Sequence, residues 1–327
     1  YSYNVFKIIM TLKLHTMIKI MSKPFKIRTL AILLNLLLIA CNSTTPENNQ
    51  NSENTSSSTA VTQVKENQAD KPEIENAERV VALTSLSADI IHRLDADNLV
   101  GVPGSRLLRK DERFKELQAV SEGRTPPNIE KIVALKPDLV IGAVGFHDST
   151  LKKLKELGIT TLASQTNSWD AVIKQIKDLA SATNTDPAPL LAKFDSLLKD
   201  IPEQSDSILV LVSIQPALYP NKNSWTGDLL KKFNANNLTA DLQGDSIGQG
   251  YVTLSEEKIV QQNPEILLVV DPSRAGVINQ LKSKSFWNKL KAAQNEKVYV
   301  FDYHGLVNPG SIGKIEETTN KLKQILK

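Results

Sequence analysis

Apolar and polar positions alternate in two regular ways from about residue 78 to the end of the chain. Short apolar runs, which predict buried strands, are separated by stretches in which every third or fourth residue is apolar, as on one face of a helix. Strands that alternate with helices predict an α/β fold with mostly parallel sheets, in which loops after the carboxyl ends of the strands face a ligand. The expected strands are 80–83, 99–102, 117–121, 139–142, 159–162, 208–212 and 298–301, the expected helices include 88–94, 151–157, 169–180, 225–233 and 312–326, and the expected loops include 213–223 and 303–311.

One unit of this pattern occurs twice. The sequence NIEKIVALKPDLVI at 128–141 returns as SEEKIVQQNPEILL at 255–268, so equivalent residues are 255 − 128 = 127 positions apart. In each copy Asn128 or Ser255 can cap a short helix, a proline ends that helix, and an apolar strand follows. Two copies so far apart indicate two similar α/β lobes, because a solenoid needs at least three copies at a period of roughly 20–50 residues. Two lobes imply a cleft, which is the usual place for a ligand.

A helix is expected to join the two lobes. Asp186 and Pro187 form a helix start, the apolar residues from Leu190 to Ile201 follow helical spacing, and Pro202 ends the pattern. A helix of about 15 residues, roughly 22 Å long, predicts a stiff hinge and a small closure, although the same pattern also fits an ordinary surface helix. We therefore expect an N-terminal α/β lobe at 78–185, a connector helix at 186–204 and a C-terminal α/β lobe at 205–327.

Basic residues are concentrated at the start of the chain. The whole chain has 39 Lys and Arg residues against 36 Asp and Glu, a formal charge of +3. Residues 1–41 hold six of the basic residues and no acidic one, so 39 − 6 = 33 basic residues face 36 acidic ones in 42–327, a charge of −3. This balance gives no basic surface that would indicate a nucleic-acid partner.

The end of that basic segment has the features of a signal sequence. Met21 is followed by Lys23, Lys26 and Arg28 and then by the apolar run 30–39. That run is shorter than the about 20 residues that a permanent spanning helix needs. It ends in Leu-Ile-Ala-Cys, which resembles a bacterial lipobox, and Cys41 is the only cysteine of the chain. We expect a lipoprotein signal peptide with the lipid on Cys41; an ordinary secretory signal is the alternative.

A polar segment separates Cys41 from the first expected strand. Residues 42–77 are rich in Asn, Ser, Thr, Gln and Glu and contain no aromatic residue. Such a composition cannot bury enough apolar surface to fold by itself, so we expect a disordered tether that spans roughly 30–35 Å on average. The chain opens with Tyr1, and we interpret residues 1–20 as an over-extended start that precedes the signal peptide within 1–41.

The sequence offers little support for catalysis. It contains neither a GxxxxGK phosphate loop nor a GxGxxG pattern, and the stretch PGSIG at 309–313 lacks the first glycine of a nucleophile elbow. His147 and His304 each follow a strand, beside Asp148 and Asp302, and these four side chains could bind zinc or manganese. No tight HxH or HExxH spacing supports such a site. A zinc- or manganese-dependent enzyme is therefore kept only as an alternative.

The internal repeat singles out candidate ligand contacts. Arg124 and Tyr251 stand six residues before Glu130 and Glu257, in the loops that enter the two repeat helices, so they should occupy matching places in the two lobes. An arginine fork binds carboxylate, catecholate and other anionic oxygens, and tyrosine offers a flat face and a donor. Each could also be an ordinary surface residue. Further candidates in loops of the same kind are Arg106, Arg274, Tyr219, Tyr303 and His304.

Four stretches together resemble one known family, the helical-backbone, class III substrate-binding proteins of ABC importers. The resemblance covers about residues 78–327, and NIEKIVALKPDLVIG at 128–142 is its most specific part. The family includes binding proteins for ferric siderophores, ferric citrate, haem and vitamin B12, and it implies two α/β lobes joined by one long helix. The other three stretches are RVVALTSLSADII at 79–91, YVTLSEEKIV at 251–260 and KVYVFDYH at 297–304.

The resemblance also assigns roles to residues. In the family one exposed glutamate per lobe docks onto arginines of the permease, and the matching positions here are Glu130 and Glu257. The vitamin B12 binder has aromatic residues where this chain has Arg124 and Tyr251, so the arginine favours an anionic ferric chelate over a corrin. Haem stays open, because Tyr251, Tyr303 or His304 could ligate iron. Zinc and manganese binders of the wider group carry clustered histidines that this chain lacks.

These inferences converge on a membrane-tethered solute-binding lipoprotein. We expect it to capture a ferric siderophore or ferric citrate outside the cytoplasmic membrane, in the periplasm, and to deliver it to an ABC permease with its ATPase. We expect a monomer that makes and breaks no bonds and needs no cofactor. The alternatives are a cobalamin- or haem-binding protein of the same family, the metal-dependent enzyme that would use His147 and His304, and an adhesion or scaffold lipoprotein without a small ligand.

Overall fold

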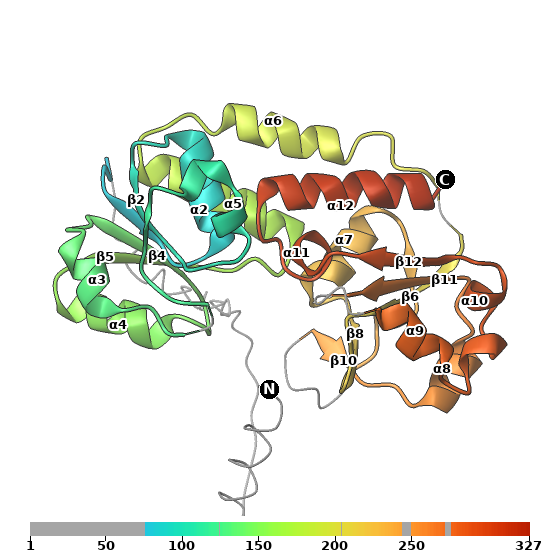
Figure 1. Ribbon diagram of the computed structural model, residues 1–327. Helices are drawn as coiled ribbons and strands as arrows, with labels where there is room; N and C mark the ends of the chain where they lie inside the picture. The colour runs from blue at the N-terminus through green and yellow to red at the C-terminus, as the bar shows by residue number, and fades with distance from the viewer. Residues whose placement is uncertain (1–75, 124, 204, 244–249, 272–275) are drawn as a thin grey trace, which may run out of the picture. The chain divides into compact units, whose positions relative to one another are not determined.

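The computed structural model describes residues 76–123, 125–203, 205–243, 250–271 and 276–327 (Figure 1). The expected signal peptide, the lipid site Cys41 and the tether lie outside the described residues. Within the described ranges, no helix combines the length and the apolar character that crossing a bilayer requires.

The first lobe is built on a five-stranded parallel sheet. The sheet confirms the α/β fold with parallel strands that the alternating pattern predicts. The chain moves from the central strand to one edge and then returns to fill the other edge, which is the strand order of a doubly wound sheet. From edge to edge the strands are β3 (Gln118–Ala119), β2 (Leu99–Val102), β1 (Val80–Ala82), β4 (Leu139–Ala143) and β5 (Thr160–Ser164).

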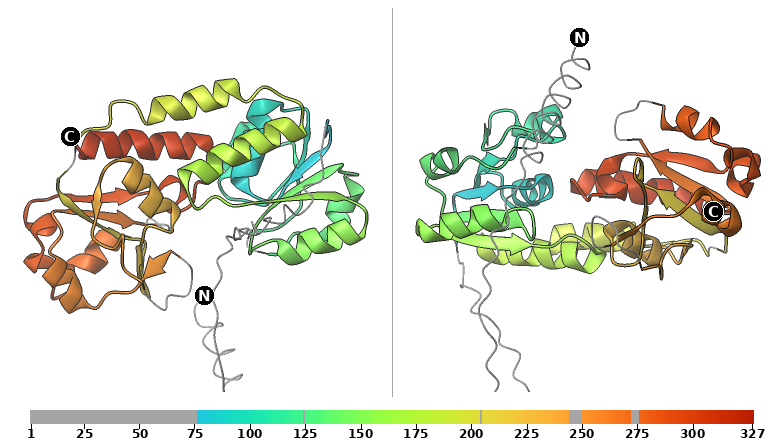
Figure 2. Two further views of the ribbon diagram at one scale, coloured as in Figure 1. Left: turned by 180° about the vertical axis from the view of Figure 1, so that it is seen from behind. Right: turned by 90° about the horizontal axis from the view of Figure 1, so that it is seen from below.

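Each helix of this lobe begins where its sequence provides a polar cap or a turn. Side chains of Thr84, Asn128 and Ser168 accept backbone N–H groups of the first turns that they precede, which satisfies donors that a helix leaves unpaired. The helices pack their apolar faces on both sides of the sheet (Figures 1 and 2). They are α2 (Ser85–Leu94), α3 (Ile129–Ala134), α4 (Asp148–Glu156) and α5 (Trp169–Ala182), with 3-10 turns η1 (Leu108–Lys110) and η2 (Glu112–Phe114).

The second lobe repeats the central part of this plan. Its main sheet is parallel, and the order is β12 (Val298–Phe301), β11 (Ile266–Val270), β6 (Ser207–Leu211) and β9 (Asn236–Asn237). Its helices are α7 (Trp225–Lys232), α8 (Glu256–Gln262), α9 (Val277–Lys282), α10 (Lys291–Gln294), α11 (Tyr303–Leu306) and α12 (Ile312–Ile325), with the 3-10 turn η3 (Trp287–Lys289).

The loop expected at 213–223 is wrong in part. Strands β7 (Ser213–Ile214) and β8 (Ala217–Pro220) form an antiparallel hairpin there, and β8 also pairs with β10 (Tyr251–Val252). Strands of two to four residues are too short to show the alternation by which a strand is recognised in a sequence. The expected loop 303–311 contains α11, although non-helical backbone at His304 and Gly305 interrupts that short helix.

The two copies of the internal repeat have the same kind of helix cap and the same backbone conformation at the helix end. Asn128 Oδ1 accepts the N–H of Lys131 at 2.8 Å, and Ser255 Oγ accepts that of Lys258 at 3.3 Å. Lys136 and Asn263, again 127 positions apart, both adopt positive φ at the ends of α3 and α8. The two helices and the strands after them are therefore equivalent parts of the two lobes.

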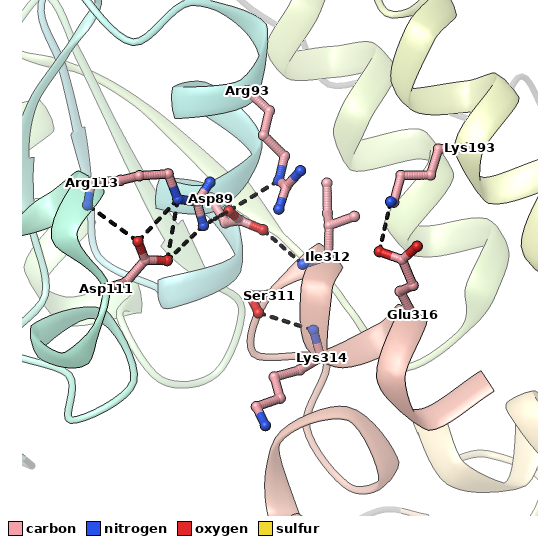
Figure 3. A network of polar contacts seen from close by, with 9 residues as sticks. All are labelled: Asp89, Arg93, Asp111, Arg113, Lys193, Ser311, Ile312, Lys314 and Glu316. Atoms are coloured by element: carbon pink, nitrogen blue, oxygen red, sulfur yellow. Dashed lines mark hydrogen bonds and ion pairs between the residues drawn. The ribbon is translucent and has the colours of Figure 1, made fainter. Parts of the chain in front are cut away.

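The connector between the lobes lies beside a helix of the second lobe. The connector α6 (Ala188–Leu197) has 10 residues and is shorter than the expected helix at 186–201. Beside it lies α12, and Lys193 of α6 forms an ion pair of 2.6 Å with Glu316 of α12 (Figures 1 and 3). The pairing of α6 with α12 was not expected, because a sequence pattern marks the buried face of a helix without naming what covers it.

The lobes share one hydrophobic core. A single cluster of buried side chains includes strands β1 and β4 of the first lobe and β6 and β11 of the second. Trp169 of α5 lies at its middle, with ring centroids 5.0 Å from Phe194 and 6.0 Å from Trp225. Smaller clusters cover the other face of each sheet. The apolar contacts therefore continue from one sheet to the other.

Candidate functional site

The first half of the candidate site is the carboxyl edge of the first sheet. Strand β2 follows β1 in the chain and pairs with it on the side toward β3. Strand β5 follows β4 and pairs with it at the opposite edge of the sheet. The chain therefore changes direction between β1 and β4, and doubly wound sheets bind ligands at such a switch point. The loops that leave this point are residues 83–84 after β1 and 144–147 after β4.

The turn after β4 presents an aromatic ring to solvent. Phe146 is 88% exposed, and Val144 beside it is 43% exposed. The turn itself is fixed, because Asp148 Oδ1 accepts the N–H of Gly145 at 2.9 Å and Ala143 O accepts that of His147 at 2.9 Å. An exposed ring on a fixed turn is a ready apolar contact for a ligand. Phe146 is not among the residues expected at the site, although an aromatic residue directly after a strand end and a glycine was a visible signal in the sequence.

His147 has a structural task in the same turn. Its Nδ1 accepts the backbone N–H of Ala143 at 3.0 Å, so the neutral ring carries its proton on Nε2. Burial lowers the pKa of His147, although the nearby Asp148 carboxylate acts in the opposite direction. A ring with one nitrogen used as an acceptor and the other protonated has no lone pair for a metal.

A polar cluster lies beneath these loops. Gln175 of α5 is 2% exposed and donates from Nε2 to Ser87 Oγ at 2.9 Å and to Ser164 Oγ at 2.8 Å. Ser87 is within 2.7 Å of the Thr84 hydroxyl at the start of α2. Gln175 Oε1 has no hydrogen-bond partner among the described residues. This buried network joins α2, α5 and the end of β5 next to the switch point.

The second lobe brings together three of the expected ligand contacts. The rings of Tyr303 and His304 meet edge to face with centroids 5.5 Å apart, and Tyr303 is 37% exposed. Tyr251 lies close enough to Tyr303 to interact with it electrostatically; burial first, and Tyr303 second, raise the pKa of Tyr251 to about 12. The phenol of Tyr251 can therefore donate a hydrogen bond at neutral pH.

His304 lies where this loop meets the first lobe. Gly310 leaves no room for a Cβ, which would come within 2.5 Å of His304 Nδ1 and 3.0 Å of Leu107 Cδ2. The pKa of His304 is lowered by burial and by Lys314, against the effect of Asp302. Its Nδ1 has no hydrogen-bond partner in the part of the chain that the structure describes. Arg106, the expected contact that precedes Leu107, is exposed.

Three expected ligand contacts remain, Tyr219, Arg124 and Arg274. Tyr219 is only 2% exposed and belongs to the core cluster on the outer face of the second sheet. Burial raises the pKa of its phenol, and its role in the core accounts for its position, so we leave it out of the site. Arg124 and Arg274 lie outside the described residues.

The two repeat glutamates stand exposed in the first turns of α3 and α8. Neither Glu130 nor Glu257 forms an ion pair with any described residue. Their acidic neighbours do: Glu256 pairs with Lys284 at 3.4 Å, and Glu122 lies 3.8 Å from Lys131. The pKa of Glu257 is lowered by its own backbone N–H and by the Ser255 hydroxyl. Each lobe thus offers an uncompensated carboxylate at an equivalent position.

Over the described ranges, no three His, Cys, Asp or Glu side chains converge as metal ligands would. The arrangement instead offers aromatic rings, hydroxyl groups and hydrogen-bond donors at strand ends of two lobes. That combination can hold a small molecule, and it shows no activated nucleophile beside a base.

The chain belongs to a family of transport proteins. The family model described as "Periplasmic binding protein" matches residues 80–303. In Bacillus subtilis (strain 168), an uncharacterized ABC transporter substrate-binding lipoprotein, YvrC, is 27% identical over 68% of this chain and 72% of its own length. The Fe(3+)-citrate-binding protein YfmC of the same organism is 26% identical over 68% of this chain and 73% of its own.

Further similarities extend to a vitamin B12-binding protein and to solved structures. The vitamin B12-binding protein of Vibrio cholerae is 26% identical over 76% of this chain and 90% of its own. The crystal structure of the periplasmic haem-binding protein HutB of V. cholerae superposes with a TM-score of 0.63 at 21% identity, over 76% of this chain and 98% of its own. The crystal structure of a possible iron-binding protein of Staphylococcus epidermidis superposes with a TM-score of 0.65 at 22% identity, over 77% of this chain and 99% of its own. These structures confirm the two-lobed fold, and the family indicates transport rather than catalysis.

Proposed function

We propose that this chain is the substrate-binding protein of an ABC importer and that it carries iron as a small anionic chelate, a ferric siderophore or ferric citrate. The family membership supports the importer. The observation that supports the substrate is the group of Tyr251, Tyr303 and His304, whose phenol and imidazole groups suit the oxygen atoms of such a chelate. Arg106 and the expected contacts Arg124 and Arg274 would add positive charge.

The protonated state of Tyr251 bears on how the chelate is held. With a pKa raised to about 12, the phenol is neutral at physiological pH and can donate a hydrogen bond to an oxygen of the chelate. Donors that surround an already complete chelate recognise its charge and shape. This mode favours an intact ferric complex as the substrate.

Haem or cobalamin is the second candidate. Phe146 is a broad apolar surface that a flat macrocycle could cover, and the imidazole of His304 is a nitrogen ligand that haem iron accepts, through Nε2 because Nδ1 is buried. Named relatives of this chain include binding proteins for vitamin B12 as well as for ferric citrate. The two candidates differ in whether one side chain binds the metal directly.

Calorimetric and fluorescence titrations of the purified protein distinguish these ligands. The panel is a ferric catecholate, a ferric hydroxamate, ferric citrate, cobalamin, haemin and zinc. Trp169, Trp225 and Trp287 are all buried, at 4%, 3% and 8% exposure, so their quenching reports energy transfer to a coloured ligand rather than changes of solvent contact.

We expect submicromolar binding of one class of ferric chelate. Binding of cobalamin or haemin alone would keep the importer and replace the substrate, and a haemin spectrum that changes in a His304→Ala variant would identify the iron ligand. Zinc binding with turnover would favour the enzyme. No binding to any member of the panel would contradict the proposed function.

The N-terminal part of the proposal concerns location. We propose that Cys41 carries a lipid that holds the body on the outer side of the cytoplasmic membrane, where the permease is met. The support is the lipobox-like sequence that ends at Cys41 and the relative that is named a lipoprotein. Mass spectrometry of the membrane fraction, compared with a Cys41→Ala variant, tests the lipid.

A further inference from the structure

A buried carboxylate connects the first lobe to the last helix of the chain. Asp89 of α2 is 0% exposed, and its Oδ1 forms ion pairs with Arg93 at 3.1 Å and with Arg113 at 2.8 Å (Figure 3). Arg113 pairs in addition with Asp111 at 2.7 Å. A buried charge is tolerated when it is paired in this way. We call Asp89, Arg93, Asp111 and Arg113 the Asp89 cluster.

The other oxygen of Asp89 leaves its own lobe. Asp89 Oδ2 accepts the backbone N–H of Ile312 at 2.8 Å, across 223 residues of sequence (Figure 3). Ile312 is the first residue of α12, and Ser311 caps the same turn by accepting the N–H of Lys314. A carboxylate at a helix start is stabilised both by this hydrogen bond and by the helix dipole.

A second contact of the same kind runs in the opposite direction. Asp228 of α7, in the second lobe, accepts at Oδ2 the backbone N–H of Trp169 at 2.7 Å. Trp169 is the first residue of α5 in the first lobe, and Ser168 caps that turn. Each lobe therefore supplies a carboxylate to the first turn of the last helix of the other lobe.

The two contacts join equivalent elements. Helix α2 follows the central strand β1, and α7 follows the hairpin of β7 and β8 that comes after the central strand β6. Helix α5 follows the edge strand β5, and α12 comes after the edge strand β12 and α11. Helix α11, which precedes α12, is held in the second lobe as well, because Trp225 Nε1 donates to Gly305 O at 2.7 Å and Thr226 Oγ1 donates to Leu306 O at 2.7 Å. The first turns of α5 and α12 are thus fixed points that both lobes share.

We propose that Asp89 and Asp228 are positioning residues that set the spacing of the two lobes. On the basis of the proposed function, we infer that this spacing keeps the exposed glutamates Glu130 and Glu257 at the separation that the permease recognises. The contacts involve helix starts and a common core, so ligand binding moves the loops of the site more than it moves the lobes. Neither residue contacts the proposed ligand.

A proline substitution tests the contact of Asp89 without disturbing the arginines paired with it, Arg93 and Arg113. Proline is well accepted at the first position of a helix and removes only the N–H there, and Ser311 already has the extended backbone that precedes a proline (φ −162°, ψ 161°). Ile312→Pro therefore deletes the donor to Asp89. Ile312→Ala removes a similar part of the side chain and keeps the N–H, which makes it the matched control.

The distance between the lobes is the direct readout. Spin labels on Glu156→Cys and Lys289→Cys, both at exposed positions, in the full chain with Cys41→Ser, report the distance distribution by pulsed electron resonance. Loss of a charge-assisted hydrogen bond should raise the population of displaced arrangements by roughly tenfold in Ile312→Pro relative to Ile312→Ala. Asp228→Ala should act likewise, and Asp170→Ala, which breaks only the ion pair of α5 with Lys232, should not.

Equal distributions in Ile312→Pro and Ile312→Ala, together with an unchanged one in Asp228→Ala, would overturn the inference. This result is independent of any ligand, so it is distinguishable from a failure of the proposed function, which would appear as absent binding in the titration panel. Uptake by cells that carry the permease supplies the second test. Uptake should fall in Ile312→Pro while ligand affinity stays equal to that of Ile312→Ala; loss of affinity alone would assign the contact to the ligand site instead.

Discussion

At the residue scale, Phe146 is the side chain whose placement folding alone does not explain. A buried phenylalanine stabilises a protein by about 1.5–3 kcal/mol, and this one is held 88% exposed by a hydrogen-bonded turn. A ring that contributes little to stability in that position is free to serve recognition. Its location after β4, at the point where the sheet changes direction, fits contact with the ligand.

Phe146→Ser should therefore weaken ligand binding and leave stability nearly unchanged. Loss of one apolar contact of this size corresponds to about a tenfold rise in Kd, measured by calorimetry with the ligand that the panel identifies. Leu157→Ser is the control, because Leu157 is 59% exposed at the opposite end of α4. Equal affinities of the Phe146→Ser and Leu157→Ser variants would remove Phe146 from the site.

At the element scale, the internal repeat preserves a hydrogen bond that ties each repeat strand to its neighbour. Asp138 accepts the N–H groups of Glu78 and Arg79 at 2.9 and 3.0 Å, just before β1. Its equivalent Glu265 accepts the N–H of Ser207 at 2.8 Å at the start of β6. The acidic residue after the repeat proline thus satisfies the first donors of the central strand in both lobes.

The hydrogen bonds from Ser207 lower the pKa of Glu265. A carboxyl group whose pKa is lower in the folded state stabilises that state above its unfolded pKa of about 4.3, and this contribution is lost as the pH falls through the folded value. Urea unfolding should show Glu265→Gln less stable than the wild type at about pH 7, with the difference vanishing in acid. Glu116→Gln, at an exposed position, should show no such difference; a gap that persists in acid would contradict the assignment.

The elements themselves were largely visible in the sequence. The parallel strands, the caps Asn128, Ser168 and Ser255, and the two copies of the repeat follow from local patterns, and the structure confirms them. The hairpin of β7 and β8 was not predictable, because its strands are too short to show a period. Of the candidate ligand contacts, Tyr219 is buried in β8, a strand that was expected to be a loop for the same reason.

At the scale of the whole molecule, we propose that the two exposed glutamates, Glu130 and Glu257, connect ligand capture to transport. Glu130→Ala combined with Glu257→Ala should reduce uptake of the labelled ligand by about tenfold or more, since truncating charge pairs at an interface weakens it by at least that factor. Ligand affinity should stay unchanged, because both side chains are exposed helix-start residues outside the loops of the site.

The matched control is Glu122→Ala combined with Glu256→Ala. These neighbouring carboxylates already have lysine partners, Lys131 and Lys284, so their loss should leave uptake close to that of the wild type. If both double variants lose uptake equally, general surface charge rather than two specific docking points drives the association with the permease. A large loss of affinity in the first variant would place the glutamates in the ligand site.

The shared positions of α5 and α12 also limit how such a protein can be divided. Helix α12 consists of 14 residues near the very end of the chain, yet its first turn completes contacts of Asp89, which lies in the first helix that the structure describes. A product that stops before residue 312 would leave the carboxylate of Asp89 and the apolar groups around Ile312 without their partners. Neither lobe is therefore an independent module, and exchanging one lobe with that of a relative requires exchanging the helix start that the other lobe holds.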